Sequence, residues 1–289
     1  MIPALHSWSC RERFKVGGFT AHDFITLAAD SGFTAVELMT GKAGHLQHIA
    51  SEDPAYLADL LRFAASKGVR IACWSTYNDF AFVPNEAWRQ DNIAYIQRWA
   101  RIAGETGVPN LRMLTGYRVK GVGDIRLQNL VIDGIKVCVE DAERYGVNLA
   151  IENHNSIFFE AEDIRWLIDH IGSERLTTCP DPSNWATRDF LEGTGPADER
   201  ERVFAGAEAL APLATESHFK VLGFTEDGDI QGWGHEIERL TGIYAAAGYE
   251  GCLAVEYIGS GVLEADLPRA RERIEAAITA TRSLQESRP

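Results

Sequence analysis

Cysteine motifs, basic charge and long apolar runs are all scarce in this chain of 289 residues. The five cysteines include no Cys-x-x-Cys pair and lie mostly within apolar runs, which favours reduced packing residues over a disulfide framework. Lys and Arg number 28 against 42 Asp and Glu, and the resulting charge of −14 repels phosphate backbones and anionic lipid. No apolar run reaches the roughly 18 residues of a membrane span, and the first residues do not resemble a signal peptide. These absences predict a cytoplasmic protein that binds neither nucleic acid nor membrane.

Features that would divide the chain are missing as well. No proline-rich linker, low-complexity tract or charge run separates one part from another. The composition, 45% hydrophobic and 24% charged, supplies enough apolar residues for one large core. A single α/β barrel takes about 250 residues, so this length does not require two domains. We therefore expect residues 1–289 to form one domain.

Short β-rich runs alternate with longer stretches of helical period, which predicts parallel strands joined by helices. The eight predicted strands cover residues 4–9, 35–39, 69–75, 110–116, 147–154, 176–184, 215–223 and 251–257. Five helices end in a glycine just before the next strand, as in ETGVPNLRM and RYGVNLAIE, and glycine suits a left-handed helix end. Because no Gly-x-Gly-x-x-Gly follows the first strand, the repeat favours a closed (β/α)8 TIM barrel over an open, doubly wound sheet.

The segment IENHN, residues 151–155, lies where a buried strand runs out into polar residues. Glu152 and His154 are two positions apart, so in a strand they point to the same face. A carboxylate and an imidazole at the end of an apolar strand need a partner to offset desolvation, such as a metal ion or a substrate hydroxyl. A strand-end glutamate that simply reaches water is the alternative.

Functional residues of a β/α barrel project from the C-terminal ends of the strands. The last four strands end with Glu152, His154, Asp181, Asn184, His218, Lys220 and Glu256. Because adjacent strand ends converge, three carboxylates and one imidazole, those of Glu152, Asp181, His218 and Glu256, predict a divalent metal site. Such ligands favour Mn²⁺ first, then Mg²⁺ or Co²⁺, and Zn²⁺ stays open. The alternative is a ring of charges neutralised by loop Arg or Lys residues.

The segments PDPSNW (180–185) and SHFK (217–220), taken with IENHN and LAVEY (253–257), resemble the xylose isomerase-like β/α barrels. This superfamily includes ketose 3-epimerases, hydroxypyruvate isomerase, inosose dehydratase and the apurinic endonucleases. The resemblance spans essentially the whole chain. It implies the same four metal ligands, and it implies that Glu152 and Glu256 act as the acid and base pair. It does not identify the substrate, because one scaffold hosts many reactions.

One position departs from the family pattern. Epimerases and endonucleases of the superfamily commonly carry a histidine three residues after the metal aspartate, where this chain has Asn184. Asparagine can hydrogen-bond a hydroxyl but cannot carry a proton at pH 7. The third and fourth strands, ending in CWSTYN and MLTGYR, also lack the histidines that a cluster of three metals needs. Endonuclease chemistry is therefore not expected.

The expected function is a divalent-metal-dependent isomerase or epimerase of a keto sugar or related polyol. Glu152 and Glu256 would transfer a proton through a metal-stabilised enediolate. A metal-dependent lyase or dehydratase acting on an oxidised sugar, inosose or sugar glycoside is the alternative, and a non-catalytic barrel with a vestigial site is a third. The sequence leaves the sugar, the stereochemistry, the native metal and a homo-oligomeric state open.

Several further side chains are expected to bind the substrate. They are His154, Asn184, Lys220, Glu37, His6, Trp74 and Trp185. His6 and Glu37 end the first and second strands and face the same mouth. Lys220 could neutralise a developing oxyanion or form a salt bridge within the barrel. The tryptophans could stack on the C–H face of a sugar, with core packing as the alternative.

Overall fold

A computed structural model describes residues 1–41, 47–82, 85–154, 157–233 and 236–286. Its eight strands are parallel and form one sheet in the order β6-β5-β4-β3-β2-β1-β8-β7. The strands are β1 (Ile2–His6), β2 (Ala35–Met39), β3 (Arg70–Ser75), β4 (Asn110–Met113), β5 (Asn148–Glu152), β6 (Leu176–Cys179), β7 (Ser217–Val221) and β8 (Cys252–Tyr257). The alternation of strands and helices read from the sequence is confirmed.

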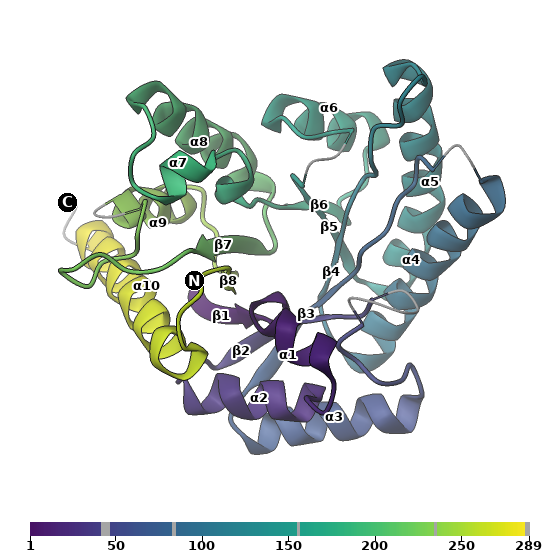
Figure 1. Ribbon diagram of the computed structural model, residues 1–289. Helices are drawn as coiled ribbons and strands as arrows, with labels where there is room; N and C mark the ends of the chain where they lie inside the picture. The colour runs from purple at the N-terminus through teal and green to yellow at the C-terminus, as the bar shows by residue number, and fades with distance from the viewer. Residues whose placement is uncertain (42–46, 83–84, 155–156, 234–235, 287–289) are drawn as a thin grey trace.

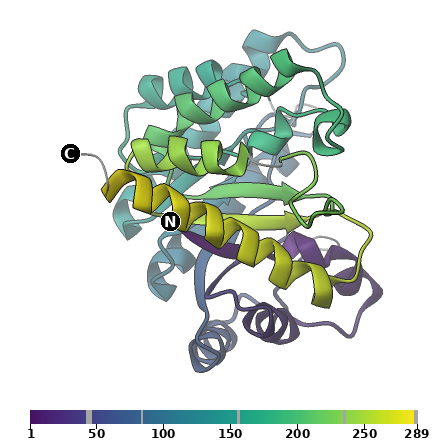
Figure 2. The ribbon, with the colours of Figure 1, turned by 90° about the vertical axis from the view of Figure 1, so that its left-hand side faces the viewer.

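The two edges of this sheet meet, because β6 and β7 are linked by backbone hydrogen bonds. The N–H of Thr215 donates to the carbonyl of Thr178 at 3.1 Å, and the N–H of His218 donates to that of Pro180 at 3.0 Å. Figure 1 shows the strands in the middle of the molecule with the helices around them. In Figure 2 the last helix, drawn in yellow, crosses outside the strands.

The helices begin and end where local sequence signals place them. They are α1 (Arg11–Val16), α2 (Ala21–Asp30), α3 (Pro54–Ser66), α4 (Glu86–Thr106), α5 (Asp124–Tyr145), α6 (Ala161–Ile171), α7 (Arg188–Leu191), α8 (Ala197–Leu210), α9 (Ile237–Ala246) and α10 (Leu263–Glu286), with short 3₁₀ helices η1 (Ser7–Cys10), η2 (Pro182–Asn184) and η3 (Ala211–Leu213). Asp53 caps α3 by accepting from the N–H of Ala55 at 2.8 Å. At Gly107 and Gly146, which end α4 and α5, φ is 70°. This left-handed conformation suits glycine and lets the chain turn into the next strand.

Several strands are shorter than the sequence predicts. The sixth strand ends at Cys179 rather than at residue 184, because Pro180 and Pro182 cannot donate ladder hydrogen bonds. The first ends at His6, where the backbone turns into η1 and the ring Nδ1 accepts from the N–H of Trp8 at 3.1 Å. The polar residues at the mouth therefore lie partly on strand ends and partly in the segments that follow them.

The core has two parts. A large cluster packs the outward faces of the strands against the helices, with Trp74 of β3 lying 5.6 Å from Trp99 of α4 between ring centroids. A separate small cluster comes from β1, β2, β3 and β8, and its buried members are Ala4, Ala35, Ala72, Cys252 and Ala254. Ala4, Ala35 and Ala254 lie two positions before His6, Glu37 and Glu256, so strand alternation turns them toward the barrel interior. The register shift between β2 and β3 lets Ala72 lie on the same side as its neighbour Cys73.

The cysteines and the helices bear on two of the expected exclusions. All five cysteines are free and buried, as expected for reduced packing residues. Among the helices of the described ranges, none has the length and apolar character needed to cross a membrane.

Candidate metal centre and active site

Polar side chains from all eight strands meet at the C-terminal end of the barrel. They are His6 of β1, Glu37 of β2, Ser75 of β3, Arg112 of β4, Glu152 of β5, Asp181 just after β6, His218 and Lys220 of β7, and Glu256 of β8. Only Lys220 is partly exposed, and the others are buried. The four predicted metal ligands are all in this set.

The imidazole of His218 lies at the centre. Its Nδ1 is 3.5 Å from Oε1 of Glu152 and 3.4 Å from Oε1 of Glu256. Ligand atoms of Glu152, Asp181 and His218 all lie within 4.8 Å of one another. Atoms bound to one ion at about 2.1 Å stand about 3.0–3.5 Å apart, so these spacings suit a small divalent cation. Nδ1 is buried and has no hydrogen-bond partner among the described residues, as a nitrogen kept for a metal would be.

The other ring nitrogen of His218, Nε2, contacts a carboxylate inside the barrel. Nε2 of His218 lies 2.9 Å from Oε2 of Glu37, and Oε1 of Glu37 lies 3.5 Å from Nε2 of His6. With Nε2 donating to Glu37, the lone pair of Nδ1 is left for a ligand. The expectation that Glu37 binds substrate hydroxyls is therefore corrected. Glu37 is fully buried and its carboxylate contacts the two histidines instead.

Fixed cations keep the carboxylates ionised. Burial opposes the charge on Glu152, but Arg112, whose Nη2 lies 2.6 Å from Oε2, and then His218 hold the pKa well below its usual range. Burial likewise opposes the charge on Glu256, while Lys220, with Nζ 3.3 Å from Oε2, and the nearby histidines lower its pKa to about 2. Both glutamates are anionic at neutral pH, as metal ligands must be.

The charge of the site also fits a divalent ion. Four carboxylates, those of Glu37, Glu152, Asp181 and Glu256, face two fixed cations, Arg112 and Lys220. With neutral histidines, as metal ligation requires, the cluster carries two negative charges, which one divalent cation would neutralise. Without a metal, burial opposes the charge on His218, but Cys179, Glu37 and Glu152 hold its pKa well above its usual range, so a protonated ring offsets one of these charges. Burying such an excess without a cation would be costly.

Asparagines position two of these carboxylates. Asn153 accepts from the N–H of Asp181 at 2.7 Å and donates to its carbonyl at 2.9 Å, so the backbone at Asp181 is fixed. Asn184 donates to Oε1 of Glu152 at 2.9 Å and accepts from Nζ of Lys220 at 2.8 Å. Asn184 and Lys220 thus lie at the site, as expected, and Lys220 also forms an ion pair with Asp181.

The sequence interpretation missed Arg112 and Asn153. Arg112 is a charge inside the short strand NLRM, and strand alternation sets it apart from its apolar neighbours Leu111 and Met113. That signal was available in the sequence. Asn153 adjoins Glu152 in IENHN and carried no separate signal.

His154 and His6 stand at the wall of the site. The ring of His154 lies edge-on to Tyr77, with 6.0 Å between centroids, and Tyr77 in turn accepts from the hydroxyl of Tyr117 at 2.7 Å. His154 is partly exposed, so its role as a substrate contact remains a prediction. Nδ1 of His6 lies 3.3 Å from Oε1 of Glu256, and Nε2 lies 3.2 Å from Ser75, so both nitrogens of His6 face protein groups.

The expectation that Trp74 and Trp185 line the mouth is wrong. Strand alternation turns Trp74 away from Cys73 and Ser75, toward α4, where Nε1 donates to Thr106 at 3.2 Å. Trp185 is buried, and its Nε1 donates to the carbonyl of Phe159 at 3.1 Å. Both indoles are packing residues.

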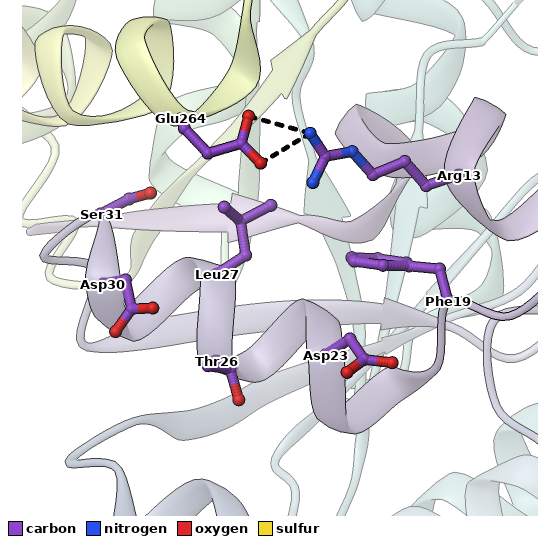
Figure 3. A pocket seen from close by; sticks show the side chains of 8 residues that line it. All are labelled: Arg13, Phe19, Asp23, Thr26, Leu27, Asp30, Ser31 and Glu264. Carbon is purple, nitrogen blue, oxygen red and sulfur yellow. Dashed lines mark hydrogen bonds and ion pairs between the residues drawn. The ribbon is translucent and has the colours of Figure 1, made fainter.

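A surface groove beside the barrel, shown in Figure 3, is lined by residues of α1, α2 and the start of α10. Three of its four charged side chains, those of Arg13, Asp23 and Glu264, already have partners. Nη2 of Arg13 lies 2.7 Å and 2.9 Å from the two oxygens of Glu264, and Asp23 accepts from the N–H of Thr20 at 2.9 Å. The barrel mouth, where polar side chains of all eight strands converge, is therefore the candidate functional site.

Comparison with known proteins agrees with this architecture. A model of the xylose isomerase-like TIM barrel family matches residues 25–284. The chain belongs to this family. The family predicted from the sequence motifs is thus confirmed. A search of curated proteins finds no match to the chain.

Several solved structures share the fold. L-ribulose 3-epimerase superposes with a TM-score of 0.75 at 16% identity, covering 100% of both chains. The IOLI protein with a binding zinc atom gives 0.71 at 12% identity, covering 97% of this chain and 99% of that one. The probable 3-DHS dehydratase AsbF from Bacillus anthracis gives 0.67 at 15% identity, covering 96% and 99%. At these identities the likeness shows the fold alone.

Proposed function

We propose that this protein is a divalent-metal-dependent isomerase or epimerase of a keto sugar or related polyol. The observation that carries the proposal is the placement of Glu152 and Glu256, whose carboxylates stand 3.5 Å and 3.4 Å from the same nitrogen of His218. Two ionised carboxylates around one cation site are suited to take a proton from a bound substrate and return it. The epimerase among the structures of the same fold adds support by analogy only.

The ion would be held by Glu152, Asp181, His218 and Glu256, and when bound it would polarise a substrate carbonyl and stabilise an enediolate. Glu152 or Glu256 removes the proton next to the carbonyl, and the other glutamate returns it. Asn184 and Arg112 keep Glu152 oriented through bonds to its two oxygens. Lys220, tied to Asp181 and Glu256, is placed to neutralise negative charge that develops on a substrate oxygen. Return to the same carbon gives epimerisation, and return to the neighbouring carbon gives isomerisation.

The finer assignments belong to the same proposal. Mn²⁺ is the expected ion, because three carboxylates and one imidazole suit it, with Mg²⁺, Co²⁺ and Zn²⁺ as alternatives. The substrate is a small sugar, residues 1–289 act as one barrel domain, and the free cysteines suit the cytoplasm.

Solvent deuterium exchange tests this function. The metal-free protein is reloaded with Mn²⁺ and incubated in D₂O with a panel of keto sugars, and the sugars are followed by NMR. We expect deuterium to enter next to the carbonyl of at least one sugar, and we expect no exchange with Glu152→Gln or Glu256→Gln. Exchange that persists in either variant would remove that residue from the proton-transfer role.

A second candidate is a metal-dependent lyase or dehydratase. It is favoured by Asn184, which donates to Glu152 at a position where epimerases of the superfamily commonly carry a histidine. The probable 3-DHS dehydratase AsbF, a solved structure with the same fold, adds support for this second candidate by analogy only. The D₂O experiment separates the two, because elimination from an oxidised sugar produces an ultraviolet-absorbing enone and epimerisation does not.

A further inference from the structure

A second group of ligand-type side chains lies deeper in the barrel, beyond Glu37 as seen from the mouth. A carboxylate oxygen of Glu37, a carboxylate oxygen of Glu216 and the thiol sulfur of Cys73 all lie within 4.8 Å of one another. The three residues come from β2, from β3 and from the position just before β7. At most 1% of each residue is exposed.

The hydrogen bonds around these groups leave oxygens open. Oε2 of Glu216 accepts from Asn110 at 3.3 Å, but Oε1 has no hydrogen-bond partner among the described residues, and neither has Oε1 of Glu37. Two carboxylates this close in a buried site need either a shared proton or a cation between them. A shared proton would involve only the two carboxylates, whereas a cation could also bind the soft sulfur of Cys73.

The cluster also has a route to solvent. A cavity of about 300 Å³ at the opposite end of the barrel from the mouth is lined by Asn110, Glu216 and Cys252. Glu216 thus belongs both to the cluster and to an opening toward solvent, which provides an entry path.

We propose that Glu37, Cys73 and Glu216 form a second cation site, specific for thiolate-binding divalent ions such as Zn²⁺ or Co²⁺. On binding, the Cys73 S–H bond is replaced by a sulfur–metal bond and the proton leaves to solvent through the cavity. Glu37 joins the two sites, because the same carboxylate holds His218. Mn²⁺ and Mg²⁺, which prefer oxygen ligands, bind at the mouth and not here. This site does not depend on the proposed isomerase activity.

Cobalt spectroscopy tests the proposal. Metal-free protein is titrated with Co²⁺, and bound cobalt is counted while the near-ultraviolet thiolate-to-cobalt charge-transfer band is recorded. None of the four proposed mouth ligands is a cysteine, but Cys179 lies beside His218, so the cysteine variants decide which site produces the band. We expect about two cobalt ions per chain with the band present. Cys73→Ser removes the band and one cobalt, whereas the mouth variant Asp181→Asn loses the other cobalt and keeps the band.

Cys138→Ser is the matched control, because Cys138 is also buried but lies in α5 and donates to the carbonyl of Ile93. It keeps both the band and the stoichiometry. Absence of the band in the cobalt-loaded wild-type protein overturns the proposal, as does a band that survives Cys73→Ser and disappears in Cys179→Ser. If circular dichroism shows that Cys73→Ser does not fold, Glu216→Gln decides. Glu216→Gln is expected to lower the cobalt affinity of the interior site, measured by titrating the charge-transfer band, at least about tenfold. An unchanged affinity contradicts the proposed site.

Discussion

Oε2 of Glu37 lies 2.9 Å from Nε2 of His218, although the two residues are 181 positions apart in the chain. This contact fixes the orientation of the imidazole and leaves its Nδ1 facing Glu152 and Glu256. A glutamine in place of Glu37 would remove the negative charge but keep a hydrogen-bond acceptor. This change should therefore weaken, rather than abolish, metal binding at the mouth.

Glu37→Gln is expected to lower Mn²⁺ affinity about 10- to 100-fold, the range found for groups that orient a metal ligand. Mn²⁺ is the appropriate probe because it selects the oxygen-rich mouth. Free Mn²⁺ is measured by electron paramagnetic resonance during titration. Glu201→Gln, which alters a surface ion pair with Arg239, serves as control. Equal affinities in the two variants would contradict the orienting role.

Substitutions of the metal ligands and of the proton-transfer residues should have different effects on bound metal and on proton exchange. Asp181→Asn and His218→Ala are expected to lose bound metal, because each removes a ligand that takes no part in proton transfer. Glu152→Gln and Glu256→Gln are expected to lower the rate of proton exchange by at least about 10²-fold even when metal is supplied in excess. Metal analysis and deuterium exchange on the same preparations check both parts. Full exchange by metal-loaded Glu256→Gln would assign the proton to another group.

His48 should make the metal-free protein sensitive to acid. Its ring is buried and stacked on Phe14, with Nδ1 2.9 Å from the hydroxyl of Ser7. Burial first, and then the charge of His6, lowers the pKa of His48 to about 3. The unfolded chain takes up this proton near pH 6.5, so the stabilisation is complete above that pH and is lost as the pH falls toward 3.

At pH 5 this loss amounts to about 2 kcal/mol relative to neutral pH. Urea unfolding in the presence of a chelator, repeated from pH 7 to pH 4.5, measures it. His48→Gln should show a smaller decline over this range than the wild-type protein. His170→Gln, which changes an exposed histidine stacked on Trp166, should leave the decline unchanged. A parallel decline in all three proteins would show that His48 does not titrate in this way.

Two helical glycines should respond in opposite directions to alanine. A Cβ on Gly206 of α8 would lie 2.6 Å from the ring of Trp185, so Gly206→Ala is expected to cost about 1–3 kcal/mol of unfolding free energy. Gly242 of α9 has no atom within 4 Å of the added carbon, so Gly242→Ala is expected to add up to about 1 kcal/mol through helix propensity. Denaturant unfolding compares the two. A neutral Gly206→Ala would contradict the buried position of Trp185.

Much of the fold could be predicted from local sequence patterns. The glycine helix ends, the cap at Asp53 and the alternation of strands and helices depend on neighbouring residues, so they were predictable from the sequence. The rule that polar residues gather at the C-terminal strand ends then placed Glu152, Asp181, His218 and Glu256 together. Trp74 shows the limit of that rule when it is applied without the alternation of the strand. Its indole belongs to the outward face, and the sequence spacing relative to Ser75 already implied it.

What the sequence by itself determined is the order of the elements, the family and which strand ends carry ligand-type side chains, because these follow from periodicity and from short motifs. The tertiary structure alone decided which groups touch. The bond from Glu37 to His218 and the ion pair of Arg112 with Glu152 join different strands, and Cys73 of β3 lies close to Glu216, just before β7. Such contacts depend on strand register, barrel curvature and side-chain rotamers, and no local pattern in the chain encodes those three together.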